Sequence, residues 1–491
     1  MNVNKPASVL QPNIVVATAD AAPAQASHTN ILLHRLGTEA GSTYLSASTS
    51  ASASTSANEY QTELASDPLG IVAGYLLQSE QLVMRSINKT VRAAVDAHLG
   101  ILTVTGPEAC ALLAQADSLR HLRDLHLTTC NDADLVNLAS VLRSSPNTAL
   151  NVFLDKKLGA EVSAAGLRAL GAVTLASLHL TDLSISPEVA DALACGSSPV
   201  SLSLPYYADG HTNVYWLSQI GRLTTLDAGK QHLSTASIGA LAAHATLTAL
   251  SISAMSGTDM RAILGAPKLC SLSVDNIING EGIAFRALAD SRVLTSLKIK
   301  HVDKAESLAA VSHNRSLTSI NLGLGALAGA GICHLANMPA LTSLVLTGRN
   351  FMLSVADVEA LCAKPRTLLG FDMMQIDPDA LNLIVSSPSA SLSLEYCSQL
   401  TDETVDALIA NRQLSALSVF GGSIDADDAQ KLISSPSLER LRVNFDSHSP
   451  GVAERNCKRA WVAAGKSLGN LDLTVHLYEE EEVSPVSLDS L

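Results

Sequence analysis

The chain repeats one short phrase, which reads Leu294-Thr-Ser-Leu297-Lys-Ile299, then Leu317-Thr-Ser-Ile320-Asn-Leu322, then Leu341-Thr-Ser-Leu344-Val-Leu346. The pattern is leucine, two residues, an apolar residue, one residue and a second apolar residue. It recurs about every 24 residues over residues 99–473, in about fifteen copies. The central apolar residue of each copy is, in chain order, Leu125, Val152, Leu178, Leu202, Leu226, Leu250, Leu272, Leu297, Ile320, Leu344, Phe371, Leu392, Leu417, Leu441 and Leu471. This period predicts a solenoid, in which each unit buries its apolar face against its neighbours.

Each repeat predicts one strand followed by one helix. Alternation within the phrase directs Leu297 and Ile299 inward and Lys298 outward, as in a strand. Later in the repeat, apolar residues three and four positions apart predict a helix, as in residues 405–410. Parallel strands pack about 4.8 Å apart, whereas helices approach no closer than about 8 Å. The stack must therefore bend, and the expected fold is an α/β solenoid with its strands on the concave face.

Composition indicates a protein partner and argues against several other classes. The formal net charge is −14 and the Lys and Arg residues are scattered, whereas nucleic-acid binding needs a positive footprint that displaces counterions. No run reaches the roughly 18 apolar residues of a membrane span. The first residues lack the basic start and apolar stretch of a signal peptide. The eight cysteines show no regular framework, so we expect reduced, structural thiols.

No motif predicts catalysis, a metal or a cofactor. Cys130-Asn131-Asp132 fits the Cys-x-Asp nucleophile of some bacterial ubiquitin ligases, but it directly follows a strand phrase and only 18 residues follow Leu473. The histidines lack zinc-hydrolase spacing, and Gly323-Leu-Gly325 lacks the Lys-Ser/Thr of a phosphate-binding loop. Arg349 is the nearest candidate for a GTPase-activating arginine, but a loop arginine is usually only solvated. We expect a non-catalytic protein without a cofactor.

The chain divides into four expected segments. Residues 1–66 contain the Ser/Ala tract 46–57, which has almost nothing to bury and predicts disorder, as an idle leader or a secretion address. Residues 67–98 form a separate helical block, and residues 99–473 hold the repeats. Residues 474–491 form an acidic tail, which we expect to be solvated and flexible.

The ends of a solenoid need caps, because an open end exposes its core. The helical block is expected to shield the N-terminal end, and Trp461 is expected to help close the other. Within the repeats, Asp357 and Asp402 stand just before helical segments and are expected to cap their N-termini.

The repeats resemble leucine-rich repeats. The commonest form places Asn after the strand; here that position holds Cys at Cys130 and Cys397, as in the cysteine-containing subclass of eukaryotic F-box proteins. Gly239-Ala-Leu-Ala242 and Gly325-Ala-Leu-Ala328 spell the tetrapeptide that names a group of bacterial effectors. The chain is thus similar to the GALA-type F-box/leucine-rich-repeat type III effector family of plant-pathogenic bacteria.

The helical block resembles an F-box. It reads Asp67-Pro-Leu-Gly-Ile-Val-Ala-Gly-Tyr-Leu76, then a polar turn, then Leu82-Val-Met-Arg-Ser-Ile-Asn-Lys89. An F-box likewise has an Ile/Val-rich helix that ends in Tyr-Leu, a turn, and a Leu-x-x-x-Arg-x-x-(Asn/Ser)-(Lys/Arg) helix. The block departs from it in its Asp-Pro start and in lacking a Trp in the last helix. The resemblance implies docking on a host Skp-family adaptor through Pro68, Leu69, Ile71, Val72, Tyr75, Leu76, Leu82, Arg85 and Asn88.

The resemblance implies a two-part adaptor. The protein would be delivered by a type III system into the host cytoplasm or nucleus, dock on the Skp-family adaptor of a cullin ubiquitin ligase, and hold an unknown host target with its repeats. The outward strand positions expected to meet that target are His179, Asp227, Lys298, Asn321, Asp372 and Arg442. The alternative is a non-catalytic repeat scaffold that sequesters a host protein, with the helical block serving only as a cap.

Overall fold

The computed structural model describes most of the repeats. The described residues are 101–105, 122–128, 130–144, 150–155, 162–181, 187–195, 200–204, 215–229, 233–302, 304–325, 331–348, 352–397, 400–421, 424, 426–447 and 450–477. The expected leader, the F-box-like block with its adaptor-docking positions from Pro68 to Asn88, and residues 478–491 lie outside the described residues. The chain splits into two compact units, Met1–Val162 and Ser163–Leu491.

The described residues of the first unit form three parallel strands and a helix. Strands β1 (Ile101–Thr105), β2 (Asp124–Thr128) and β3 (Asn151–Asp155) pair in register, with Leu102 opposite Leu125 and Leu125 opposite Val152. Strand β1 adds a copy that the repeat count left out, although Leu99-Gly-Ile-Leu102-Thr-Val104 fits the phrase. Helix α6 (Asp132–Ser144) begins at a reciprocal cap, because the Asn131 and Asp134 side chains each accept from the other's backbone N–H.

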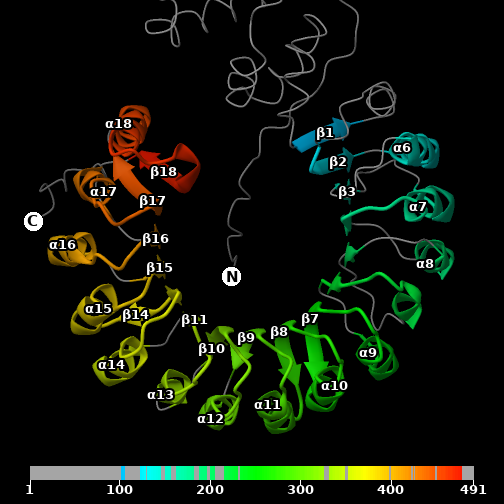
Figure 1. The fold of residues 1–491 in the computed structure, drawn as a ribbon, viewed down its shortest axis with the longest axis horizontal. Coiled ribbons are helices and arrows are strands. Elements are labelled where there is room, and N and C mark those ends of the chain that lie inside the picture. The colour runs from blue at the N-terminus through cyan, green and yellow to red at the C-terminus, as the bar shows by residue number, and fades with distance from the viewer. Residues whose placement is uncertain are drawn as a thin grey trace, which may run out of the picture. The chain divides into compact units, whose positions relative to one another are not determined.

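In the second unit, the strands line the inner, concave side of a curved stack and the helices lie on its outer side (Figure 1). The strands of the main sheet are β4 (Ser177–Thr181), β5 (Ser201–Ser203), β6 (Thr225–Asp227), β7 (Ala249–Ser256), β8 (Ser271–Ile278), β9 (Ser296–Val302), β10 (Ser319–Leu324), β11 (Ser343–Thr347), β13 (Leu368–Asp372), β15 (Ser391–Glu395), β16 (Ala416–Phe420), β17 (Arg440–Ser447) and β18 (Leu471–Leu477). A separate short pair joins β12 (Met352–Leu353) to β14 (Gln375–Ile376).

One helix or helical turn lies between most successive strands of this sheet. The helical elements are α7 (Ala164–Gly171), α8 (Pro187–Ala194), η2 (Tyr215–Gln219), α9 (Thr235–Ala242), α10 (Gly257–Ile263), α11 (Glu281–Asp290), α12 (Ala305–Val311), α13 (Ile332–Ala336), α14 (Val355–Cys362), α15 (Pro378–Val385), α16 (Asp402–Ala410), α17 (Ala426–Ile433), α18 (Pro450–Ala463) and η4 (Leu468–Asn470).

The core is built from the central apolar residues of the phrase. Leu297, Ile320 and Leu344 stand opposite one another in adjacent strands and are at most 1% exposed. The inward assignment is confirmed, and so is the α/β leucine-rich-repeat fold with parallel strands on the concave face. Strand β18 continues past residue 473 to Leu477.

The register expected for one repeat was wrong. Leu369, and not Phe371, stands opposite both Leu344 and Leu392. Both residues of β13 point inward and are fully buried, so alternation alone does not choose between them. The register is fixed by Thr367, whose hydroxyl donates to the Thr342 carbonyl at 2.9 Å and so places Leu369 opposite Leu344.

That hydroxyl belongs to a row of side chains that stand directly before the strands. A Thr or Ser two positions before the central residue donates to a backbone carbonyl of the preceding coil at Thr224, Thr248, Thr295, Thr318, Thr342, Thr367 and Ser415. These bonds fix the register of each strand relative to the strand of the preceding coil. The threonine of the Leu-Thr-Ser-Leu phrase is therefore the sequence signal that predicts the correct register.

A second row of polar side chains follows the helices. Its members place a nitrogen 2.6–3.1 Å from a backbone carbonyl of the preceding coil, and they are His244, Asn314, Arg366, Asn411 and Lys466. The row satisfies buried carbonyls that no regular secondary structure would reach.

The helix caps differ from the expected ones. Ser354 caps α14 and Thr401 caps α16, each accepting from a backbone N–H at the third residue of its helix. Asp357 and Asp402 instead lie in the first turn, where a carboxylate favours the positive end of the helix dipole. Near the C-terminal end of the second unit, Trp461 is fully buried, as expected. Its Nε1 donates to the Ser467 carbonyl at 2.8 Å.

Candidate binding groove on the concave face

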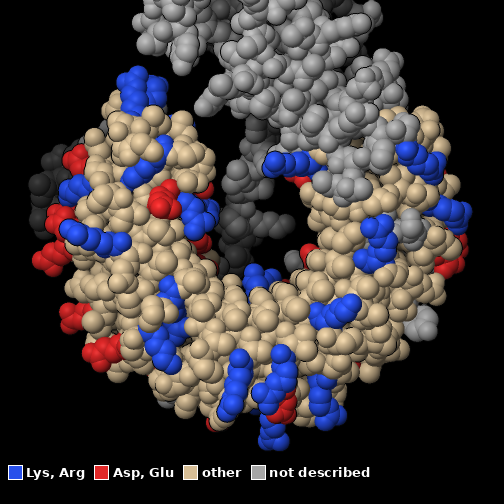
Figure 2. Space-filling model, viewed as in Figure 1, with Lys and Arg blue, Asp and Glu red and all other residues tan. Residues whose placement is uncertain are grey.

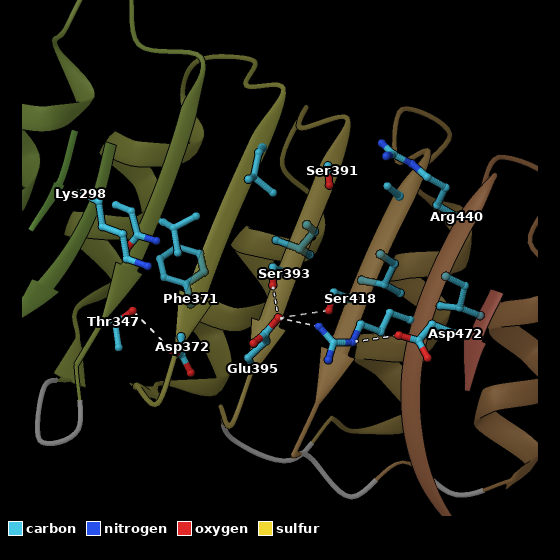
Figure 3. Close-up of a pocket in the computed structure, with 18 of the residues that line it drawn as sticks. Lys298, Thr347, Phe371, Asp372, Ser391, Ser393, Glu395, Ser418, Arg440 and Asp472 are labelled. Atoms are coloured by element: carbon cyan, nitrogen blue, oxygen red, sulfur yellow. Dashed lines mark hydrogen bonds and ion pairs between the residues drawn. The ribbon is translucent and has the colours of Figure 1, made fainter. Parts of the chain in front are cut away.

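A groove of about 840 Å³ lies on the concave face of the second unit. It crosses β9, β10, β11, β13, β15, β16 and β17 and reaches η4 and β18 (Figure 3). Because the strands are parallel and in register, their outward side chains form rows that run along the groove. The central row is Lys298, Asn321, Val345, Gly370, Ser393, Ser418, Arg442 and Asp472.

The floor at the middle of the groove is formed by small residues. Gly370, Ser393 and Ser418 follow one another on β13, β15 and β16. A Cβ atom on Gly370 would lie 3.1 Å from a Val345 methyl group, so the glycine relieves crowding between neighbouring strands. Gly370 is itself buried, whereas Ser393 and Ser418 are half-buried and present small polar side chains to the groove.

A second glycine shapes the β9 end of the groove. The register between β9 and β10 shifts between Leu322 and Leu324, which makes a bulge at Gly323. A Cβ atom at Gly323 would stand 1.8 Å from the Lys300 carbonyl oxygen, so only glycine fits. Gly323 was considered above as part of a phosphate-binding loop; the structure gives it this close backbone approach.

Arg442 is held in place by contacts with three other strands. Its Nε lies 3.3 Å from Asp472 Oδ2 and its Nη1 lies 3.9 Å from Glu395 Oε1. Its guanidinium also lies 5.1 Å from the Phe420 ring centroid. Such half-exposed ion pairs stabilise the fold little, so their main effect is to orient the guanidinium toward the groove.

Glu395 is oriented in the same way. Its carboxylate accepts from the Ser393 hydroxyl at 3.3 Å and from the Ser418 hydroxyl at 3.4 Å (Figure 3). On β13, the neighbouring Asp372 accepts from the Thr347 hydroxyl at 3.4 Å. Glu395 and Asp372 are therefore held in place by hydroxyl groups of the sheet.

Two lysines lie on β9. Lys300 forms an ion pair with Asp275 at 2.8 Å, whereas Lys298 is exposed and has no ion pair with any residue that the structure describes. Over the face drawn in Figure 2, Lys and Arg side chains stand in separate groups with Asp and Glu between some of them.

The structure brings four of the six expected target-facing residues into this groove: Lys298, Asn321, Asp372 and Arg442. Asp372 is outward as expected but lies one row further along its strand, opposite Glu395 and Thr347. His179 lies on β4, with its Nε2 3.0 Å from the Ser177 hydroxyl, and Asp227 lies on β6, where it accepts from the Gly229 N–H at 3.0 Å. These two residues are outside the lining of the groove.

The sequence analysis predicted only the central outward residue of each strand and missed the outward residues two positions before and after it. Lys300 and Glu395 lie two positions after the central row, and Arg440 lies two positions before it. Strand alternation would have identified them, because residues two apart share a face.

The described cysteines are free thiols. Cys130 is buried, and Cys397 donates to the Phe371 carbonyl at 3.3 Å, which links its loop to the preceding coil as Asn would in the commonest repeat. Burial raises the pKa of Cys397 to about 11 and does the same for Cys362. Among the described residues there is no cluster that could hold a metal ion, and no helix of that part of the chain is long and apolar enough to cross a bilayer.

Comparison with known proteins gives no matching family model and no matching curated protein. Among solved structures, the chain is similar to an internalin (inlF) from Listeria monocytogenes str. 4b F2365, at 17% identity over 77% of this chain and 94% of that chain, with a TM-score of 0.32. It is also similar to TLR13 in a TLR13–ssRNA13 complex, at 15% identity over 77% of this chain and 65% of that chain, with a TM-score of 0.34. The parallel register and the leucine core make the repeat region of this chain an α/β leucine-rich-repeat solenoid.

Proposed function

We propose that this protein is a secreted bacterial effector that acts as an F-box substrate receptor inside a host cell. The block at residues 67–98 docks on a host Skp-family adaptor of a cullin ubiquitin ligase, and the repeats hold a host target protein. The observation that carries the binding half is the groove of about 840 Å³ on the concave face. The docking half is supported by the order of residues in the block, from Ile71 and Tyr75 through Arg85 to Asn88.

The groove has the properties of a protein-binding surface. Arg442 and Glu395 are fixed by contacts within the sheet, so these two side chains lose little entropy when a partner binds. The floor of the groove presents the small, half-buried side chains of Ser393 and Ser418. A rigid surface with fixed polar groups favours recognition of one partner over others.

A capture experiment tests the docking half. Full-length protein is immobilised and incubated with a purified Skp-family adaptor, which we expect it to retain. Replacing Leu69, Ile71 and Tyr75 together by Ala removes apolar surface that the F-box likeness assigns to the adaptor, and capture should be lost. Replacing Gln78, Ser79 and Gln81 by Ala in the expected polar turn is the matched control, which should bind normally.

Circular dichroism melting of both variants shows whether the repeats remain folded. Loss of capture with an unchanged melting temperature supports docking through the block. Retained capture by the Leu69/Ile71/Tyr75 variant, or no capture by the unmutated protein, contradicts it.

The second candidate is a scaffold that sequesters its partner without ubiquitin transfer. It is favoured by one observation: the described residues that line the groove all lie within residues 298–472, in the repeats. Binding of a target without binding of the adaptor would support this candidate.

A further inference from the structure

The groove is nearly neutral, in contrast to the whole chain. The protein has a formal net charge of −14. The groove is nevertheless lined by four Lys and Arg residues against three Asp and Glu residues; they are Lys298, Lys300, Arg440, Arg442, Asp372, Glu395 and Asp472. Asp275, which pairs with Lys300 from outside the lining, makes four carboxylates for four cations. A cation of this groove that has no carboxylate beside it can therefore take a negatively charged group of a ligand.

Two of the four cationic side chains already form ion pairs with carboxylates of this protein. Arg442 pairs with Asp472 and Glu395, and Lys300 pairs with Asp275. Lys298 and Arg440 are exposed, and neither forms an ion pair with another described residue. The positive charge left for a ligand therefore lies at two points, one on β9 and one on β17.

The distance between these points sets the size of the ligand. Six strand steps separate β9 from β17 in the sheet, which at about 4.8 Å per step is about 29 Å. An extended chain rises about 3.3 Å per residue, so about nine residues span the gap. Between the two points, the central row holds the small, half-buried side chains of Ser393 and Ser418, over which a main chain can pass.

We propose that the groove binds an extended acidic segment of a partner protein, which crosses the strands and places one carboxylate at Lys298 and a second at Arg440. The inference deepens the proposed function and rests on its target-binding half. A basic segment would face two unpaired cations. A nucleic acid would need many uncompensated cations along its backbone, and the groove offers two.

Fluorescence polarisation of the full-length protein with a defined probe tests this inference. The probe is a fluorescein-labelled ten-residue peptide with Glu at both ends and Ser, Thr and Ala between. The comparison peptides carry Gln at both ends, Lys at both ends, or two Glu residues separated by only three others. The acidic ten-residue probe should bind about tenfold more tightly than the Gln peptide and than the closely spaced Glu peptide.

Charge-reversal variants locate the site. Lys298→Glu and Arg440→Glu should each weaken binding of the acidic probe about tenfold, and the double variant should prefer the Lys-ended peptide. Lys364→Glu is the matched control, because Lys364 is exposed and lies outside the groove lining. Equal binding of the Glu and Gln peptides, or equal effects of all three single variants, would overturn the inference.

The outcome is independent of the adaptor experiment. If the adaptor is not captured but the acidic probe binds as described, the F-box proposal fails and the groove inference stands. If the adaptor is captured but the probe does not discriminate by charge, the partner chemistry inferred here is wrong while the docking half of the function stands.

Discussion

Replacing either of two asparagines seven positions apart by Ala should change the unfolding free energy by very different amounts. Asn314 is fully buried and belongs to the polar row that follows the helices, whereas Asn321 faces outward in the groove. We predict that Asn314→Ala lowers the unfolding free energy strongly, and that Asn321→Ala leaves it almost unchanged.

The magnitude follows from the bonds of Asn314. Its Nδ2 donates to the Leu288 carbonyl at 2.6 Å and to the Ser291 carbonyl at 2.9 Å, and its Oδ1 accepts from the N–H groups of Ser316 and Leu317 at 2.7 and 2.8 Å. The bonds to Leu288 and Leu317 are buried, so their backbone groups would be left unpaired. Each unpaired buried group costs about 1–3 kcal/mol. The expected loss is therefore about 3 kcal/mol, against less than about 0.5 kcal/mol for Asn321, which is half-buried and faces the groove.

Urea unfolding followed by circular dichroism measures both changes from the shift in midpoint. Amide hydrogen exchange should place the loss of protection in the coils next to residue 314, because each coil contacts only its neighbours. The reasoning would be refuted if Asn314→Ala unfolded within about 1 kcal/mol of the unmutated protein, or if Asn321→Ala destabilised it as much.

Three further outcomes are expected. Leu297→Asp should lower the unfolding free energy by more than about 4 kcal/mol, because it buries an unpaired carboxylate at a site that is 1% exposed. Lys298→Asp is the surface control. An equal loss of unfolding free energy in the two variants would contradict the inward assignment of Leu297. Gly323→Ala should cost about 1–3 kcal/mol and weaken binding of the acidic peptide, since a Cβ 1.8 Å from the Lys300 carbonyl must displace the bulge; an unchanged melting temperature and affinity would show that the bulge adapts freely. At pH 8, iodoacetamide should modify exposed Cys195 well before Cys397, whose pKa of about 11 keeps it a thiol, and equal rates by mass spectrometry would contradict this. The raised pKa also favours the folded state below pH 9, so this contribution should be lost as the pH rises from 9 to 11.

Most of the fold could be predicted because a solenoid is specified by local information. Inward placement of Leu297, Ile320 and Leu344 follows from alternation within each phrase, and the curvature follows from the different widths of strands and helices. The one register error, Phe371 for Leu369, arose where two inward residues of β13 are both apolar. The hydrogen bond of Thr367 to the preceding coil resolves it, and that bond exists only between coils.

The candidate site was predicted less completely. Alternation identified Lys298, Asn321 and Arg442 as outward residues. It gave no reason to separate them from His179 or Asp227, which are equally outward but lie outside the groove.

The sequence by itself determined the period and the two faces of each strand, because these depend on neighbouring residues in the chain. Only the tertiary structure decided which charges remain available to a partner. Arg442 is neutralised by Asp472 and Glu395 from other strands, while Lys298 and Arg440 are not. Charge pairing depends on distances between coils, which follow from the register of the whole stack rather than from any single repeat.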